Sequence, residues 1–238
     1  MFHLRDGVPF EDPLNLLRRA AIKLYSIWVG MTYPFAFKGR NLSIHYRSEL
    51  PRSHAHRIKL GRAVTLQKDA ALYVRAPLDG KGDPVVVIDE GCVIGRRSTI
   101  SAKNGVYLER DVILGSSVFI QDHSHAYSDI TLAIWQHGMT EGGRIRIGQG
   151  CWIGDGAVVH CDNGELTLGR NCVVAPNSLV IRSFPACSLI SGNPAHVLKQ
   201  FDPVRGVWVL GLISPAPTEA VHPQPGAYLR SSTAEEDV

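Results

Sequence analysis

Large aliphatic residues recur every six positions over much of the chain, in several units followed directly by glycine and commonly by a small residue at the fifth place of the unit. The segments 94–99, 114–119 and 153–158 show the unit most clearly. Fifteen aliphatic residues fall in five triplets, at positions 60, 66 and 72; 88, 94 and 100; 108, 114 and 120; 147, 153 and 159; and 168, 174 and 180. This period predicts short strands joined by tight turns and wound into a parallel β-helix, with three units in each triangular coil.

The aliphatic residue that starts each unit is predicted to point inward, together with the small residue at its fifth place. One interior column should then contain Ile94, Leu114, Ile153 and Val174. Glycine at the second place of the unit is expected to tolerate the geometry of the turn.

The interruptions of the period all follow the third unit of a coil. They lie between positions 72 and 88, 100 and 108, 120 and 147, and 159 and 168. All four insertions should therefore leave the prism at one corner, and functional residues often lie on loops that a rigid scaffold positions. We expect the longest insertion, a protruding loop at about 121–144, to dominate the site.

The two ends of the chain differ from the repeats. Residues 1–57 are predicted to be helical or extended, with a helix over 13–31 that either covers the open end of the prism or packs in an oligomer. Residues 13–37 also suggest a peripheral contact with a membrane surface, since a charge-free stretch follows three basic residues. The β-helix should span 58–201, and 202–238 forms an extension that is predicted to be mobile after about 214.

Composition narrows the class of protein. The 238 residues carry a net charge of +3, which argues against a dedicated nucleic-acid-binding protein. No apolar run reaches the roughly 18 residues of a membrane span, and the first residues do not resemble a secretory signal. The five cysteines include no CxxC pair, so a cytoplasmic, reduced protein is predicted. Three of them share the fifth place of the first unit in their coils and should be buried, unpaired fillers: Cys92, Cys151 and Cys172.

Histidines mark the start of the long insertion. Residues 120–127 read Ile-Gln-Asp-His-Ser-His-Ala-Tyr and contain His123 and His125. A histidine just outside the β-helix wall can act as a general base near neutral pH, and Asp122 or a backbone carbonyl could fix its tautomer. Two alternatives remain open at this point: a metal site formed with His160, or histidines with a purely structural role.

Several motifs resemble those of one known family. Residues 147–154, Ile-Gly-Gln-Gly-Cys-Trp-Ile-Gly, and residues 191–195, Ser-Gly-Asn-Pro-Ala, are similar to the closing coils of the hexapeptide-repeat, left-handed β-helix acyltransferases. Asp122-His123 stands where the sugar O-acetyltransferases of that family carry a histidine before the long loop. The N-terminal helix and residues 199–209 look closer to the bacterial exopolysaccharide and lipopolysaccharide acetyltransferases.

The resemblance implies a metal-free transfer of an acyl group from acetyl-CoA to a hydroxyl, in a homotrimer whose active sites lie between neighbouring prisms. His123 would be the base, with Asp122 and His125 as further catalytic candidates. The positions that match CoA contacts in the family are Trp152, Gly154, Asp155, Pro176, Ile181, Arg182, His196 and Lys199.

The predicted function is O-acetylation of a sugar in a bacterial surface polysaccharide or its lipid-linked precursor, in the cytoplasm or at the inner face of the membrane. The chain departs from the galactoside-type enzymes at 96–98, where Arg-Arg-Ser replaces a catalytic asparagine. Two alternatives are N-acetylation of an amino sugar and a noncatalytic β-helix that serves as a scaffold or binding subunit. The sequence does not identify the acceptor.

Overall fold

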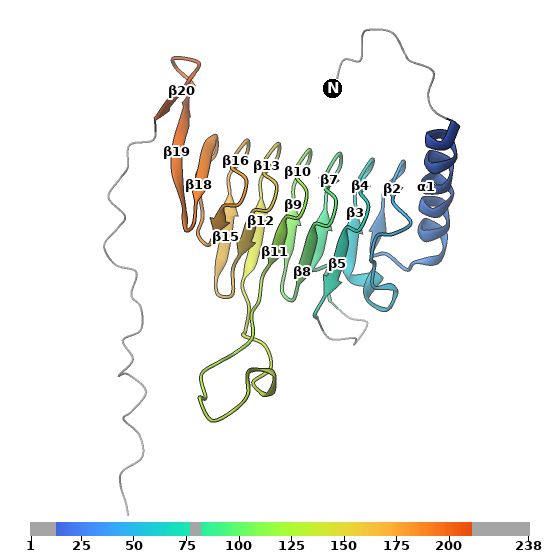
Figure 1. Cartoon of the computed structure of the whole chain (residues 1–238), viewed down its shortest axis with the longest axis horizontal. Helices are drawn as coiled ribbons and strands as arrows, with labels where there is room; N and C mark the ends of the chain where they lie inside the picture. Colours follow the sequence, from blue (N-terminus) through green and yellow to red (C-terminus); the bar gives the residue numbers. More distant parts are fainter. Residues whose placement is uncertain (1–12, 77–81, 211–238) are drawn as a thin grey trace, which may run out of the picture.

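The computed structural model describes residues 13–76 and 82–210. Within them, three sheets wind around one axis, and Figure 1 shows the coils stacked side by side along the molecule. The predicted mobile tail after about 214 lies outside the described residues.

Sheet A has six strands, in the order β1 (Phe37–Lys38), β3 (Ile58–Leu60), β6 (Val86–Ile88), β9 (Val106–Leu108), β12 (Arg144–Ile147) and β15 (Glu165–Leu168). Sheet B begins with β2 (Ser43–Ile44), β4 (Thr65–Leu66), β7 (Val93–Ile94), β10 (Ile113–Leu114), β13 (Trp152–Ile153) and β16 (Val173–Val174). It continues with β18 (Ser188–Gly192), β19 (Ala195–Asp202) and β20 (Val207–Leu210). Sheet C contains β5 (Ala71–Val74), β8 (Thr99–Ala102), β11 (Phe119–Gln121), β14 (Val158–His160) and β17 (Leu179–Val180).

The strand register confirms the predicted interior column. Ile94 pairs with Leu114, Leu114 with Ile153, and Ile153 with Val174, all in parallel and all buried. The strands of the three sheets pair in parallel until β18, after which β19 and β20 close sheet B as antiparallel strands. The core is therefore the inside of the prism, filled by one aliphatic side chain from each unit.

The cysteine prediction is also confirmed. Cys92, Cys151 and Cys172 are fully buried and free. The Cys92 thiol donates to the carbonyl of Glu109 at 3.0 Å, and burial raises its pKa to about 12. These thiols therefore serve as small apolar fillers of the prism.

The glycines at the second place of the units do not have the predicted role of accommodating the turn. The residue with left-handed backbone is the fourth of the unit, as at Arg97, Ser117 and Asn177. A Cβ added at Gly154 would instead lie 2.6 Å from the backbone nitrogen of Pro176 in the next coil. Glycine is thus required by the close approach of stacked coils rather than by the turn itself.

The helix α1 (Pro13–Thr32) covers the N-terminal end of the coils (Figure 1). Its Val29 is fully buried in the core, and the hydroxyl of Ser26 accepts the backbone N–H of Ile44 at 2.8 Å.

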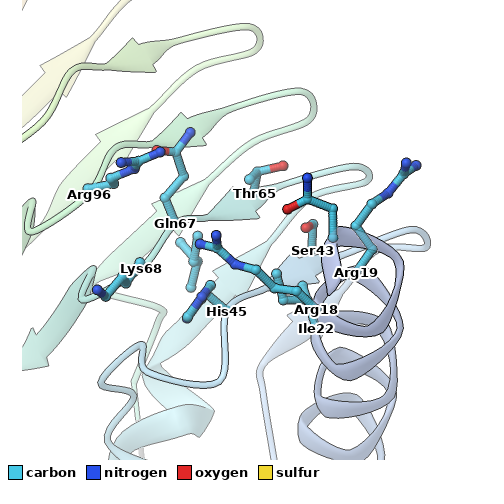
Figure 2. Close-up of a pocket in the computed structure, with 11 residues that line it drawn as sticks. Arg18, Arg19, Ile22, Ser43, His45, Thr65, Gln67, Lys68 and Arg96 are labelled. Atoms are coloured by element: carbon cyan, nitrogen blue, oxygen red, sulfur yellow. The ribbon is translucent and has the colours of Figure 1, made fainter. Parts of the chain in front are cut away.

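Strands β1 and β2 follow α1 and join the sheets upstream of residue 58, and the 3₁₀ helix η1 (Arg52–Arg57) leads into β3. Between α1 and the strands β2 and β4 lies a pocket of about 350 Å³ (Figure 2). None of the helices in the described ranges is long and apolar enough to cross a membrane.

The opposite face of α1 is apolar and exposed. The large exposed side chains on that face of the helix are Leu14, Leu16, Leu17, Leu24, Ile27, Trp28 and Met31.

The loop at 121–144, which includes the 3₁₀ helix η2 (Ile134–Gln136), projects from the body of the β-helix (Figure 1). Large apolar side chains of this loop are exposed as well, among them Ile130 and Trp135.

Candidate active site

A pocket of about 320 Å³ lies where the outer face of sheet C meets the base of the protruding loop. Strands β5, β8 and β11 or the residues next to them contribute one set of lining side chains, and the loop contributes the other. The lining residues are Tyr73, Arg75, Thr99, Ser101, Phe119, Gln121, His123, Ser124, His125 and Met139.

The chain turns away from the wall at Asp122, directly after β11. The backbone carbonyl of Asp122 accepts the N–H of Gly143 at 2.7 Å, so the two ends of the loop meet at this point. Asn104 Nδ2 donates to the carbonyl of Glu141 at 2.8 Å, and Lys103 Nζ donates to the carbonyl of Thr140. The base of the loop is therefore held against the preceding coil, which restricts the position of His123.

Asp122 is a fully buried carboxylate with a complete set of donors. Its Oδ1 accepts the N–H of Lys103 at 2.7 Å, and its Oδ2 accepts those of Asn104 at 2.8 Å and Gly105 at 2.7 Å. Burial by itself would raise the pKa of this carboxyl, but hydrogen bonds from His123 and from the three amides outweigh it and hold the pKa below its ordinary value. Asp122 is therefore ionised at neutral pH.

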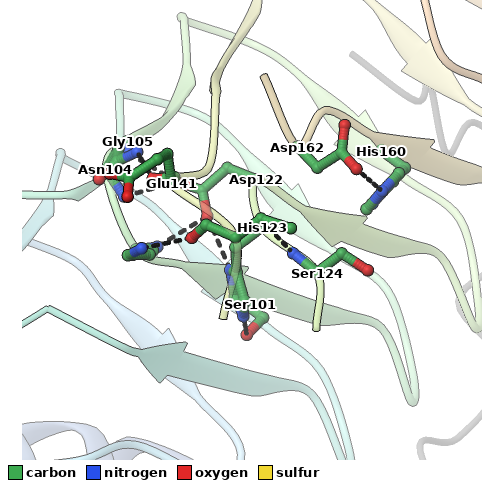
Figure 3. A network of polar contacts seen from close by, with 11 residues as sticks. Ser101, Asn104, Gly105, Asp122, His123, Ser124, Glu141, His160 and Asp162 are labelled. Carbon is green, nitrogen blue, oxygen red and sulfur yellow. Dashed lines mark hydrogen bonds and ion pairs between the residues drawn. The ribbon is translucent and has the colours of Figure 1, made fainter. Parts of the chain in front are cut away.

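His123 is oriented by this carboxylate. Its Nδ1 lies 2.9 Å from Asp122 Oδ1, a contact drawn in Figure 3. The His123 side chain is 5% exposed. An ionised carboxylate only accepts hydrogen bonds, so Nδ1 carries the proton and Nε2 keeps a free lone pair. Nε2 lies 3.5 Å from the hydroxyl oxygen of Ser101, which lines the pocket. The pair thus presents a basic nitrogen to the pocket.

The other histidines occupy different environments. His125 lines the same pocket but is exposed, and it forms an isolated β-bridge with Met139. His160 lies on β14, with Nε2 3.9 Å from Asp162 Oδ2. No group of three or more His, Cys, Asp or Glu side chains is placed to hold a metal ion within residues 13–76 and 82–210. The structure therefore does not bring His123, His125 and His160 together as a ligand set.

Sequence reasoning missed most of the pocket wall. Tyr73, Ser101, Gln121 and His160 form one ladder, because the parallel register pairs each with the next along sheet C. Each directly follows an inward aliphatic residue, so its side chain points outward. The six-residue period already predicts this outward column. In each coil, the column contains the residue that directly follows the first residue of the third unit.

The residues predicted to contact CoA fall into two groups. The first surrounds the turn after β13: Trp152 is 46% exposed, and Gly154 packs against Pro176 of the next coil. Asp155 Oδ1 accepts the N–H of Ser116 at 2.6 Å, which links two stacked turns. That contact gives Asp155 a clear role in the scaffold.

The second group lies beside the β18–β19 hairpin. Arg182 donates to the carbonyl of Ala195 at 3.4 Å and lies over the ring of Phe184, and the neighbouring Ile181 is 52% exposed. His196 and Lys199 both lie on β19. The structure thus places four of the eight candidates around one turn and four near the closing hairpin.

No protein-family model matches the chain, whereas several curated proteins and solved structures are similar to it. A protein of Escherichia coli K12, provisionally named a lipopolysaccharide biosynthesis O-acetyl transferase, is 30% identical over 137 residues, 55% of this chain and 68% of that protein. A protein of Mycobacterium tuberculosis, provisionally named an acetyltransferase, is 28% identical over 71% of this chain and 51% of its own length. Serine acetyltransferase of Staphylococcus xylosus is 33% identical over 48% of this chain and 49% of its own length.

Among solved structures, AntD, an N-acyltransferase from Bacillus cereus in complex with dTDP and 3-hydroxybutyryl-CoA, matches with a TM-score of 0.59. The match covers 75% of this chain and 86% of that one at 15% identity, and shows a common fold. The predicted left-handed parallel β-helix is confirmed. The chain belongs to the hexapeptide-repeat acyltransferases, and it spans about half the length of the mycobacterial and staphylococcal relatives.

Proposed function

We propose that this protein is an acetyl-CoA-dependent O-acetyltransferase that acts on a sugar hydroxyl of a bacterial surface polysaccharide or its lipid-linked precursor. The observation that carries the proposal is the Asp122–His123 pair, in which the carboxylate holds the Nδ1 proton and leaves Nε2 unprotonated, 3.5 Å from the hydroxyl of Ser101 at the pocket. The name of the similar Escherichia coli protein refers to lipopolysaccharide biosynthesis. This similarity supports a sugar of a surface polysaccharide as the acceptor.

In the proposed reaction, Nε2 of His123 takes the proton of the acceptor hydroxyl as its oxygen attacks the thioester carbonyl. A tetrahedral intermediate forms, and the C–S bond then breaks. The leaving thiolate of CoA takes the proton from the imidazolium, so the products are an acetyl ester and free CoA. Asp122 stabilises the transient imidazolium, because its carboxylate lies 2.9 Å from Nδ1.

The donor would bind along the C-terminal coils, with Trp152 beside the pantetheine and with Gly154, Asp155, Pro176 and Ile181 as further contacts. Arg182 and Lys199 are suited to its phosphates, since both side chains donate from a positive charge, and His196 would contribute beside them. The exposure of Trp152 and the position of Arg182 beside the β18–β19 hairpin support this assignment.

The active unit would be a homotrimer with sites between neighbouring prisms. The protruding loop supports this, because its large apolar side chains are solvent-exposed in the single chain: Tyr127, Ile130, Leu132, Ile134, Trp135 and Met139. A surface of this kind normally marks an interaction site. A sedimentation-equilibrium mass of three chains is expected, and a monomer would contradict the proposal.

The protein would act in the cytoplasm, with a peripheral contact to the inner membrane face through residues 13–37. The exposed apolar face of α1 supports this contact, and Arg18, Arg19 and Lys23 lie along the same helix. Co-sedimentation with anionic vesicles tests it: the wild type should pellet, and the double variant Leu24→Asp, Met31→Asp should stay in solution. Equal recovery of both proteins in the supernatant would contradict the contact.

The experiment that tests the activity is acetyl transfer from radiolabelled acetyl-CoA to a panel of sugars, amino sugars and lipid-linked saccharides. Ester-linked acetate, released by mild alkali, is the expected product. Alkali-stable acetate found only on amino sugars would establish the N-acetyltransferase alternative. Absence of both transfer and acetyl-CoA binding would favour a noncatalytic β-helix.

A further inference from the structure

The pocket between α1 and the first coils has the composition of an anion-binding site. Four cationic side chains line it, and none of its described lining residues is acidic. Figure 2 shows Arg18 extending from the helix toward the turns that carry Lys68 and Arg96, whereas Arg19 points away from them. The lining residues are Asn15, Arg18, Arg19, Ile22, Ser43, His45, Thr65, Leu66, Gln67, Lys68 and Arg96.

The cations come from three separate elements. Arg18 lies on α1, Lys68 in the turn after β4, and Arg96 in the turn after β7. None of these three side chains makes a hydrogen bond or ion pair with any residue in 13–76 or 82–210. By contrast, the nearby Arg47 is paired with Asp69 at 2.8 Å. An anion in this pocket of about 350 Å³ would be attracted by three cations that have no other partner in the described part of the chain.

His45 provides an independent indication of the ligand. It is 5% exposed, its Nδ1 accepts the backbone N–H of Arg47 at 3.1 Å, and its Nε2 is buried without a hydrogen-bond partner in the described part of the chain. Because Nδ1 is an acceptor, the proton of the neutral ring lies on Nε2. The unpartnered group is therefore a donor, and the missing partner is an acceptor.

Burial and the surrounding charges both favour the neutral form of His45. Burial lowers its pKa first, Arg18, Lys68 and Arg47 lower it further, and Asp69 acts in the opposite direction. The ring is thus neutral at pH 7, with one N–H to donate.

We propose that this pocket binds a phosphate or diphosphate group, held by Arg18, Lys68 and Arg96 and by the Nε2–H of His45. A diphosphate carries several negative charges and many acceptor oxygens, which matches donors arriving from three elements better than a single carboxylate does. Sugar precursors carry this group on either a nucleotide or a polyprenyl lipid. The site lies at the opposite end of the β-helix from the proposed CoA contacts (Figure 1).

The test is a calorimetric titration of inorganic diphosphate into the full chain and its variants, with thermal unfolding to check that each variant is folded. Arg18→Ala and Lys68→Ala should each weaken binding by about tenfold, because each removes a charge-assisted contact. Arg110→Ala removes an exposed arginine in the turn after β9, outside the pocket, and should bind like the wild type.

His45 is tested through the donor it supplies. His45→Gln, which keeps an N–H, should bind more tightly than His45→Phe. If the substitutions of buried His45 do not fold, Arg18→Ala and Lys68→Ala decide between the outcomes. Wild-type affinity in Arg18→Ala and Lys68→Ala, or no binding of diphosphate to the wild type, would overturn the proposal. Loss of diphosphate binding in the Arg182→Ala, Lys199→Ala variant would also overturn it, because the diphosphate would then bind at the donor site.

Two further ligands show whether the bound diphosphate belongs to a nucleotide-linked or to a lipid-linked compound. UDP that binds more tightly than inorganic diphosphate would identify a nucleotide-linked compound. Retention on neutral vesicles doped with a polyprenyl diphosphate, but not on undoped vesicles, would identify a lipid-linked compound. Each result supports the pocket, and each interaction should be weakened by about tenfold in Lys68→Ala.

Discussion

The carboxylate of Asp122 lies 2.9 Å from Nδ1 of His123, and both side chains are buried against the base of the protruding loop. The same carboxylate accepts three consecutive backbone N–H groups, from Lys103, Asn104 and Gly105. One residue therefore fixes both the tautomer of the histidine and the path of the preceding turn. This double role allows catalysis and stability to be tested at one position.

Asp122→Asn should impair both properties. An amide cannot accept from His123 and all three backbone N–H groups, so at least one donor is left unpaired. The free energy of unfolding should fall by about 1.5–3 kcal/mol, the usual contribution of hydrogen bonds to a charged group. The kcat should fall by about 10²-fold, since the preferred tautomer is lost. Denaturant unfolding and steady-state kinetics measure the two effects, and an unaltered kcat would contradict the proposed role.

The pH dependence of stability should report the same carboxylate. Because the pKa of Asp122 is lower in the folded than in the unfolded protein, its stabilising effect is full above the ordinary value of 3.8 and is lost as the pH falls through the folded pKa. The difference in unfolding free energy between the wild type and Asp122→Asn should therefore shrink below pH 3.8. Denaturation curves from pH 7 to pH 2 test this, and a constant difference would contradict it.

The donor site predicts a separation of kinetic constants. Arg182→Ala combined with Lys199→Ala should raise the KM for acetyl-CoA more than it lowers kcat, because these contacts would be present in both ground and transition states. Arg170→Ala, which removes another exposed arginine of the C-terminal coils, serves as the control. Unchanged affinity for acetyl-CoA in the double variant would show that the donor binds elsewhere.

The buried cysteines should contribute to packing alone. Cys172→Ala should keep normal activity and lose about 1 kcal/mol of stability, since it removes one buried sulfur and its contact with the carbonyl of Pro185. In the native wild type, Cys92 should resist thiol reagents at pH 8, whereas the half-buried Cys187 should react. Rapid modification of Cys92 without unfolding would show that the core is more open than the structure indicates.

The scaffold was predictable because its period maps directly onto a repeated geometry. Each coil repeats the same inward positions, so the register of Ile94, Leu114, Ile153 and Val174 follows from spacing alone. The β-helix also includes β1 and β2, whose short strands lie before the first regular triplet and carry too little of the period to be recognised.

The candidate site was predictable only in part. The break after Ile120 pointed to Asp122 and His123, but the three amides that bind Asp122 come from a short insertion one coil earlier. Such a contact between insertions depends on how two irregular loops fold together, and no period encodes it. The pocket beside α1 was missed for the same reason, because Arg18 and Lys68 meet only through the docking of the helix on the first coils.

The most direct test of the central claim is the rate of acetyl transfer to the acceptor by His123→Ala, measured beside His125→Ala and with acetyl-CoA affinity determined separately. If Nε2 of His123 takes the acceptor proton, His123→Ala should lose about 10²–10⁴-fold in kcat with nearly unchanged acetyl-CoA binding, and His125→Ala should keep most of its activity. Near-normal turnover in His123→Ala would contradict the account, and loss of activity in His125→Ala alone would transfer the role of base to His125.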